Sequence, residues 1–230
     1  SLYNQKRRLL AEIYASRRHK DVPIKASELL GIMLAVTAVP VEKAIDILTD
    51  VKKFISGRVI SRPEELRLFI SGGCIEEIEH LELIENCGCV IVADNICLGS
   101  RHFLDEVENE GHPLKNIADR YISHLSCPRM MGDFERRFDY LLNIRDEYGI
   151  EGAIIEKLKF CDIWGGEIYL HRQETKQHHI PLLALERELY GGGTGQIKTR
   201  IQAFLEKLRN KQATDDRLVQ AAGTDYKPKL

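Results

Sequence analysis

The sequence has almost no net charge. Its 230 residues carry 33 Lys and Arg against 35 Asp and Glu, which leaves a formal charge of −2. Nucleic acids and anionic membrane surfaces attract proteins through an excess of basic side chains. The charge balance therefore argues against nucleic acid and membrane surfaces as partners.

Several familiar patterns are also missing. No apolar run approaches the roughly 20 residues of a membrane-spanning helix, and no secretion signal opens the sequence. The six cysteines contain no CxxC pair, which disfavours a zinc ribbon and a thioredoxin-type motif. Neither GxxxxGKS/T nor an early GxGxxG is present, so ATP and dinucleotide fingerprints are absent. These absences predict a soluble cytoplasmic protein with reduced thiols.

Apolar residues are abundant enough for a folded core. Hydrophobic residues make up 43% of the sequence and charged residues 30%, as in globular proteins. The first part has helical periodicity at 3–19, 27–38 and 40–55, with Pro40 at a helix start. We therefore expect a helical layer over residues 1–60.

From residue 66 onward the periodicity changes. Short apolar runs at 66–70, 89–93, 153–158 and 180–185 alternate with helical patterns at 75–85, 114–124, 134–148, 167–176 and 197–208. Strands that alternate with helices imply crossover connections and a parallel sheet. The prediction is an α/β, doubly wound, four-stranded domain over residues 61–209. Residues 210–230 lose the periodicity and are expected to form an extended or partner-docked tail.

Cysteines follow three of the four predicted strands. Parallel sheets bind ligands beyond the carboxyl ends of their strands, where Cys74, Cys97 and Cys161 are expected to lie. A thiolate there suits iron, zinc or nucleophilic chemistry. A Cys-His nucleophile is the weaker hypothesis, because His102 is the only histidine close in sequence to one of these cysteines.

A glycine run precedes the last helical pattern. The backbone N–H groups of Gly193 and Gly195, supported by Gln196 and Arg200, suit an anion at a helix N-terminus. The alternative is a turn that only caps the helix.

These segments together resemble a known family. The motifs are ADNICLGSR at 93–101, ADRY at 118–121, SCPR at 126–129, KFCD at 159–162 and GTGQIKTRIQAFLE at 193–206. In order and spacing they resemble the 2-hydroxyacyl-CoA dehydratase and benzoyl-CoA reductase superfamily. The resemblance covers roughly residues 1–208 and implies the C-terminal half of a subunit, without its first α/β domain.

The resemblance implies a cofactor and partners. Family subunits pair and hold a four-iron, four-sulfur cluster through three cysteines, and an ATP-hydrolysing iron–sulfur activator delivers one electron to reduce an acyl-CoA. Carried over to this sequence, Cys161 in KFCD is a cluster ligand, and the preceding N-terminal domain supplies the others. Cys97 and Cys127 match family motifs and are expected to be structural or to lie beside the cluster, with a lesser expectation that they are ligands.

Two features lean towards the benzoyl-CoA reductase branch. They are the segment 183–190, and Asn95 where dehydratases commonly have an acidic residue. The expected function is therefore ATP-driven one-electron reduction of a CoA thioester of the benzoyl-CoA reductase type. The alternatives are a 2-hydroxyacyl-CoA dehydratase subunit and a non-catalytic partner subunit of such a complex.

Overall fold

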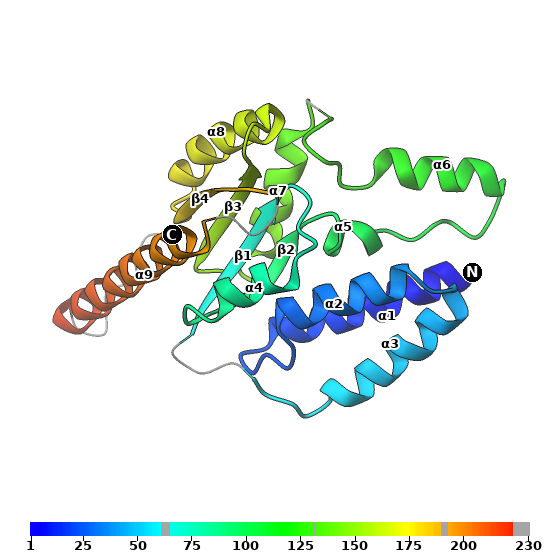
Figure 1. Ribbon diagram of the computed structural model, residues 1–230, viewed down its shortest axis with the longest axis horizontal. Helices are drawn as coiled ribbons and strands as arrows, with labels where there is room; N and C mark the ends of the chain where they lie inside the picture. Colours follow the sequence, from blue (N-terminus) through cyan, green and yellow to red (C-terminus); the bar gives the residue numbers. More distant parts are fainter. Residues whose placement is uncertain (61–64, 131, 190–192, 223–230) are drawn as a thin grey trace.

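A four-stranded parallel sheet organises the chain. The computed structural model describes residues 1–60, 65–130, 132–189 and 193–222 (Figure 1). The strands are β1 (Leu66–Gly72), β2 (Cys89–Asn95), β3 (Gly152–Leu158) and β4 (Leu182–Arg187). Their order is β2-β1-β3-β4, and every neighbouring pair is parallel. All four predicted strands and the fold class are confirmed.

Helices precede the sheet and connect its strands. In chain order they are α1 (Leu2–Ala15), α2 (Ala26–Thr37), α3 (Val41–Ile55), α4 (Ile78–Glu85), α5 (Ser100–Phe103), α6 (Pro113–Ser123), α7 (Phe134–Arg145), α8 (Asp162–Gln177) and α9 (Thr194–Ala222), with a short 3-10 turn at Ser16–Arg18. No helix within the described residues is both long and apolar enough to cross a membrane.

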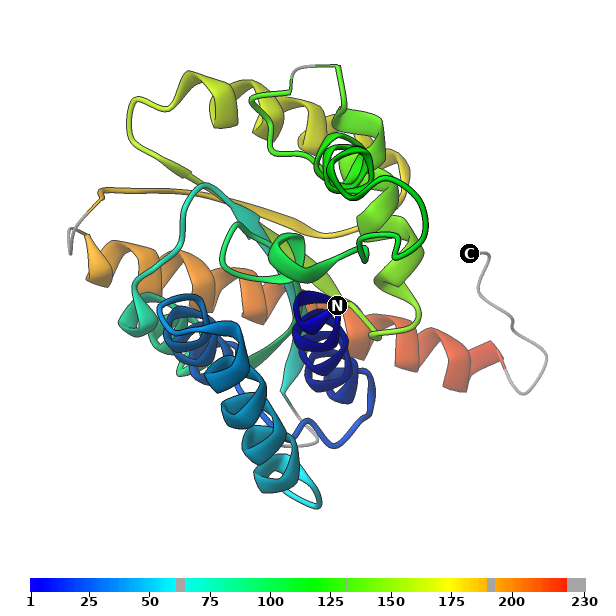
Figure 2. The ribbon, with the colours of Figure 1, turned by 90° about the vertical axis from the view of Figure 1, so that its right-hand side faces the viewer.

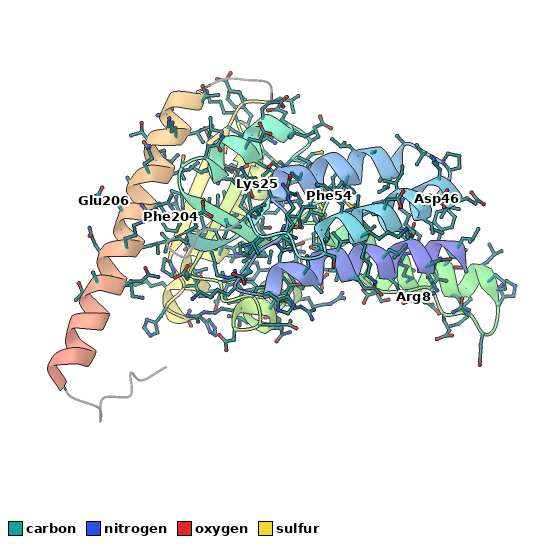
Figure 3. The ribbon with its side chains drawn as sticks, turned by 90° about the horizontal axis from the view of Figure 1, so that it is seen from below. Arg8, Lys25, Asp46, Phe54, Phe204 and Glu206 are labelled. Carbon is teal, nitrogen blue, oxygen red and sulfur yellow. The ribbon has the colours of Figure 1, made fainter. Side chains whose placement is uncertain are left out.

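The two faces of the sheet bury different helices. Along each strand, alternate side chains point to opposite faces, so Leu68 and Ile70 face one core while Phe69 faces the other. The first core also contains α4, α9 and part of α2, whereas α7 and α8 cover the second. Figure 2 shows these helices on opposite sides of the sheet. In α9, Phe204 packs towards the sheet and Glu206 lies on the exposed face (Figure 3).

The N-terminal helices form the predicted layer. Leu10, Met33 and Leu48, from α1, α2 and α3, are fully buried in a third core, which also receives Phe103 of α5. The ring of Phe103 lies 4.5 Å from that of Tyr14. The helical layer is therefore packed against the loop that follows β2.

Two helices differ from the sequence prediction. The four-residue helix α5 was not predicted, because it is too short to show periodicity. Helix α9 continues to Ala222, so residues 210–222 are helical rather than an extended tail. Residues 210–222 contain neither Gly nor Pro, the two residues that disfavour a helix most, and the next glycine in the sequence is Gly223. Residues 223–230 lie outside the described residues.

The loop after β2 depends on close packing around Asp94. Asp94 Oδ1 accepts the backbone N–H of Ser100 at 2.7 Å, and the Asp94 carbonyl accepts the Ser100 hydroxyl at 2.6 Å. A Cβ atom added at Gly99 would lie 2.1 Å from Asp94 Oδ1 and 2.6 Å from Ile96 Cγ1. Only glycine fits at this position.

We expect Gly99→Ala to lower the free energy of unfolding by about 1–3 kcal/mol, the usual cost of forcing an atom into a packed site. The control is Gly165→Ala in α8, where an added Cβ has no neighbour within 4 Å. The free energy of unfolding of that variant should rise by about 0.5–1 kcal/mol, because alanine is more stable than glycine in a helix interior. Urea unfolding of both variants measures the difference. Equal stabilities would show that the Asp94 loop is not closely packed.

Candidate functional site

The strand order places a topological switch point between β1 and β3. The chain leaves β1 towards α4 on one face and leaves β3 towards α8 on the other, so the two loops diverge. Such a switch point is where open parallel sheets bind ligands. Cys74 follows β1 and Cys161 follows β3. The ring of Trp164, in the first turn of α8, approaches within 3.6 Å of a Cβ built at Gly73, so the two loops meet.

Cys161 is held by the backbone at the start of α8. Its N–H donates to the Leu158 carbonyl at 3.1 Å, and its carbonyl accepts the N–H of Gly165 at 2.9 Å. The preceding Phe160 has a φ of 64° and is 95% exposed. The Cys161 thiol is half-buried at the start of this helix.

A buried ionic cluster lies at the ends of β3 and β4, beside the loop after β1. Both carboxylate oxygens of Glu156 are within 2.9 Å of His80 Nε2, and Arg187 Nε lies 3.5 Å from the same carboxylate. Arg187 Nη2 also donates to the Cys74 carbonyl at 2.5 Å. These contacts tie the ends of β3 and β4 to the loop after β1. Sequence reasoning missed the cluster, because its members are far apart along the chain.

Cys97 lies on the loop after β2, at the same edge of the sheet. Its exposed thiol accepts a hydrogen bond from Arg101 Nη2 at 3.1 Å. Cys74 follows β1, the parallel neighbour of β2, so the two cysteines lie at the same edge of the sheet. Burial first, then Glu76 and Cys97, raise the pKa of the Cys74 thiol. The predicted placement of these two cysteines at one edge of the sheet is therefore confirmed.

Cys127 lies on the loop that follows α6. Burial raises the pKa of its thiol, but hydrogen bonds from Arg129 and the charge of Arg101 outweigh burial and lower it. The loop is anchored by Arg137, whose Nη1 donates to the Ser126 hydroxyl at 3.0 Å. Arg137 also forms a buried bidentate pair with Glu167 of α8, at 2.6 and 3.0 Å. The pair joins the Cys127 loop to the helix that begins after Cys161.

The glycine run leads into α9 as predicted. Gly193 has a φ of 76°, a conformation that favours glycine, and its carbonyl accepts the N–H of Ile197 at 3.0 Å. Gly195 and Gln196 are exposed in the first turn. Arg200 is also exposed, and its Nη2 donates to the Ala184 carbonyl of β4 at 2.6 Å. Residues 191 and 192 lie outside the described residues. The anion-binding role of this turn stays a prediction.

The described residues offer one suitable ligand for a metal cluster, Cys161. Within the described ranges, no group of three or more His, Cys, Asp or Glu side chains could hold a metal ion. Cys161 has the softness and partial exposure that an iron ligand needs. The other ligands of a cluster would have to come from other residues.

The fold and its thiols define a class: a doubly wound domain with cysteines at the carboxyl edge of its sheet. A family model described as "2-hydroxyglutaryl-CoA dehydratase, D-component" matches residues 1–208, and the chain belongs to this family. Over 119 residues it is 27% identical to the putative dehydratase subunit YjiM of Escherichia coli (51% of this chain, 30% of that protein). It is equally identical to lactoyl-CoA dehydratase subunit beta of Anaerotignum propionicum (51% and 32%).

A further relative is (R)-phenyllactyl-CoA dehydratase beta subunit of Clostridium sporogenes, 25% identical over 118 residues (51% of this chain, 31% of that protein). The aligned part of the chain thus spans about a third of the length of these relatives. The superfamily resemblance is confirmed. The printed names of these relatives favour the dehydratase alternative over the benzoyl-CoA reductase reading.

His171 yields a test of the packing behind this site. Its ring contacts Phe134 and Phe138, and its Nδ1 has no hydrogen-bond partner among the described residues. Burial, then the charge of Arg137, lower the pKa of His171 from 6.5 to about 4. Glu167, 3.8 Å away, does not offset this because it is paired with Arg137.

Between pH 6.5 and 4 the unfolded chain therefore binds a proton at His171 that the folded chain does not. We expect the free energy of unfolding to decrease as the pH is lowered from 6.5 to 4. His171 should contribute up to about 1.4 kcal/mol per pH unit to this decrease. His171→Leu should make the fall shallower, whereas His112→Gln, at an exposed histidine, should not. Urea unfolding between pH 7 and pH 4 tests this. An unchanged slope in His171→Leu would contradict the buried, neutral histidine.

Proposed function

We propose that the chain is part of a subunit of a 2-hydroxyacyl-CoA dehydratase, an enzyme that removes water from a 2-hydroxyacyl-CoA thioester. The observation that carries the proposal is the half-buried thiol of Cys161 at the switch point between β1 and β3, in a chain of this family. The dehydratase names of the relatives support the choice of reaction.

In this proposal Cys161 is one ligand of a four-iron, four-sulfur cluster. The cluster, when bound, would supply single electrons to the thioester. The remaining ligands would come from an N-terminal domain that packs against the same edge of the sheet. Cys97 and Cys127 would lie beside the cluster, because both are engaged by arginines rather than by another metal-binding side chain.

The buried ion pairs have a positioning role. Arg187, which pairs with Glu156, donates to the backbone carbonyl of Cys74 and so holds the loop after β1. The Arg137–Glu167 pair holds α8 against the Cys127 loop. Both pairs are almost inaccessible to water, so their geometry is strongly maintained. They would hold these loops in place around cluster and substrate.

The first turn of α9 is the proposed site for substrate oxygens. Its free N–H groups suit either the thioester carbonyl, as it gains negative charge, or a phosphate of coenzyme A. Gly193 and Gly195 allow close approach of the backbone, and Gln196 and Arg200 add donors. Arg200 already uses one N–H for the Ala184 carbonyl, and its other donors would face the ligand.

The proposed partners follow from the same function. A homologous second subunit would pair with this one, and a separate ATP-hydrolysing iron–sulfur protein would deliver the electron. The relatives are named as beta subunits, which supports a multi-subunit enzyme. The ATP-binding pattern GxxxxGKS/T is absent from this sequence, and the proposal assigns ATP binding to the activator.

The reaction can be tested in the complete complex. The full subunit that contains this chain, its partner subunit, activator, ATP and a strong reductant should convert lactoyl-, phenyllactyl- or 2-hydroxyglutaryl-CoA to the unsaturated thioester. Dehydration is redox-neutral, so a catalytic amount of reductant should suffice. Cys161→Ser should abolish turnover and bleach the cluster absorption, whereas Cys87→Ser, at the end of α4, should change neither.

Other outcomes would decide against the proposal. Stoichiometric consumption of reductant with benzoyl-CoA, without dehydration, would favour the reductase reading. Loss of neither cluster nor turnover in Cys161→Ser would place the ligand elsewhere. A complex that stays active when the substrate site of this subunit is destroyed would identify a non-catalytic partner subunit.

Arg200→Ala tests the proposed substrate site. Removing one charge-assisted hydrogen bond should raise KM for the acyl-CoA about 10-fold and leave the cluster absorption intact. Lys198→Ala, also exposed in the first turns of α9, is the control and should change KM little. If Arg200→Ala instead loses cluster and circular dichroism together, Arg200 is structural.

A further inference from the structure

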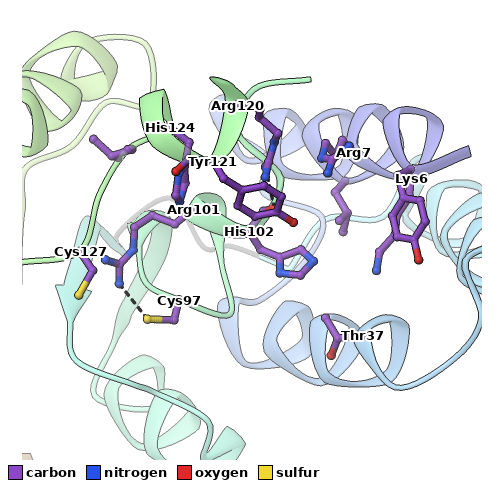
Figure 4. Close-up of a pocket in the computed structure, with 13 residues that line it drawn as sticks. Lys6, Arg7, Thr37, Cys97, Arg101, His102, Arg120, Tyr121, His124 and Cys127 are labelled. Carbon is purple, nitrogen blue, oxygen red and sulfur yellow. Dashed lines mark hydrogen bonds between the residues drawn. The ribbon is translucent and has the colours of Figure 1, made fainter. Parts of the chain in front are cut away.

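A basic cavity lies between the helical layer and the loops that carry Cys97 and Cys127. It has a volume of about 410 Å³ and is lined by side chains from α1, α2, α5 and α6 (Figure 4). Its polar wall includes Lys6, Arg7, Arg101, His102, Arg120 and His124. Cys97 and Cys127 also line it, so the cavity adjoins the proposed cluster site, whereas Cys161 and the glycine run are not among its described lining residues.

The cavity gathers positive charge without a counter-charge. Lys6, Arg7, Arg101 and Arg120 all line it, and none of its described lining residues is an Asp or Glu. Lys6 donates to the Val36 carbonyl at 2.7 Å, which carries no formal charge. Arg120 likewise donates to three carbonyls at the end of α5. These hydrogen bonds position the cations but do not neutralise them, although Glu106, which is not among the described lining residues, attracts Arg7.

The pKa values of the lining residues respond first to burial and then to the neighbouring charges. Burial and the charge of Arg7 lower the pKa of Lys6, and burial and the charge of Arg120 lower the pKa of Arg7. Burial, then Lys6, Arg120 and Arg7, lower the pKa of His102 to about 4, so this ring is neutral at pH 7. An anion in the cavity would relieve the repulsion among all of these groups.

Arg101 provides an independent sign of a ligand. Only 6% of this residue is exposed, and its Nε–H has no hydrogen-bond partner among the described residues. Its Nη2 is used by Cys97, a weak acceptor (Figure 4). A buried guanidinium donor without an acceptor is costly, and a negative charge in the adjoining cavity would offset part of that cost.

We propose that this cavity binds the phosphate or diphosphate group of a ligand. A group with two or more negative charges matches four cations better than a single carboxylate does, and guanidinium groups suit phosphate oxygens. The aromatic rings of Tyr3 and Tyr121 and the side chains of Leu10 and Leu125 form an apolar wall for the rest of the ligand. The inference does not depend on the dehydratase function, because inorganic pyrophosphate alone tests it.

The test is titration calorimetry of the 230-residue chain with inorganic pyrophosphate at constant ionic strength. Arg7→Gln removes a lining cation, whereas Arg8→Gln removes an exposed neighbour that pairs with Glu106 on the surface. We expect saturable binding to the unaltered chain, a Kd raised about 10-fold or more in Arg7→Gln, and a change below about twofold in Arg8→Gln. Arg7→Lys, which keeps the charge but not the planar donor, should fall between.

Absence of saturable binding to the unaltered chain would overturn the proposal, and so would equal weakening by Arg7→Gln and Arg8→Gln. Circular dichroism tests whether each variant is folded. If Arg7→Gln is not folded, the Kd of Arg7→Lys for pyrophosphate decides whether Arg7 contributes to binding. Two further probes separate the source of the phosphate. Tighter binding of adenosine 3′,5′-bisphosphate would indicate a coenzyme A type of ligand, whereas tighter binding of ADP would indicate a free nucleotide.

Discussion

The buried pair between Arg17 and Asp94 connects the two layers of this protein. Arg17 follows α1, and Asp94 lies near the end of β2; their closest atoms are 3.3 Å apart, and both are almost completely buried. Arg17 also stacks on Tyr14 and donates to the Ile91 carbonyl, while Asp94 accepts the N–H of Ser100. Removing one partner would leave the other charged and buried, which typically costs several kcal/mol. The position of the helical layer, and with it the wall of the basic cavity, therefore depends on this contact.

Two further buried ion pairs organise the carboxyl edge of the sheet in the same way. Arg137–Glu167 joins α7 to α8, and Arg187–Glu156 joins β4 to β3. Each arginine also donates to a backbone carbonyl of a loop that carries a cysteine. Buried charged groups tolerate few alternative arrangements, because every donor and acceptor needs its partner. The loops at this edge are thus held by side chains from beneath, not by their own backbone alone.

The edge of the sheet has two chemically different parts. At the switch point between β1 and β3, a half-buried thiol at the start of a helix suits an iron ligand. Beside β2, the cavity next to Cys97 gathers cations, and the adjoining Arg101 Nε–H has no partner in the part of the chain that the structure describes. One part suits electron chemistry and the other anion binding.

The sequence alone was enough to predict the sheet, the main helices and the family. Buried parallel strands are continuous apolar runs, and Cys161 follows one of them within a family motif, so local patterns carried this information. The sequence did not reveal the full length of α9, the helix α5 or the buried partners Glu156, Glu167 and Arg137. It also did not show that α1 places Lys6 and Arg7 in one cavity with Arg101. These features depend on contacts between residues that are far apart along the chain, and only the packing of the layers brings those residues together.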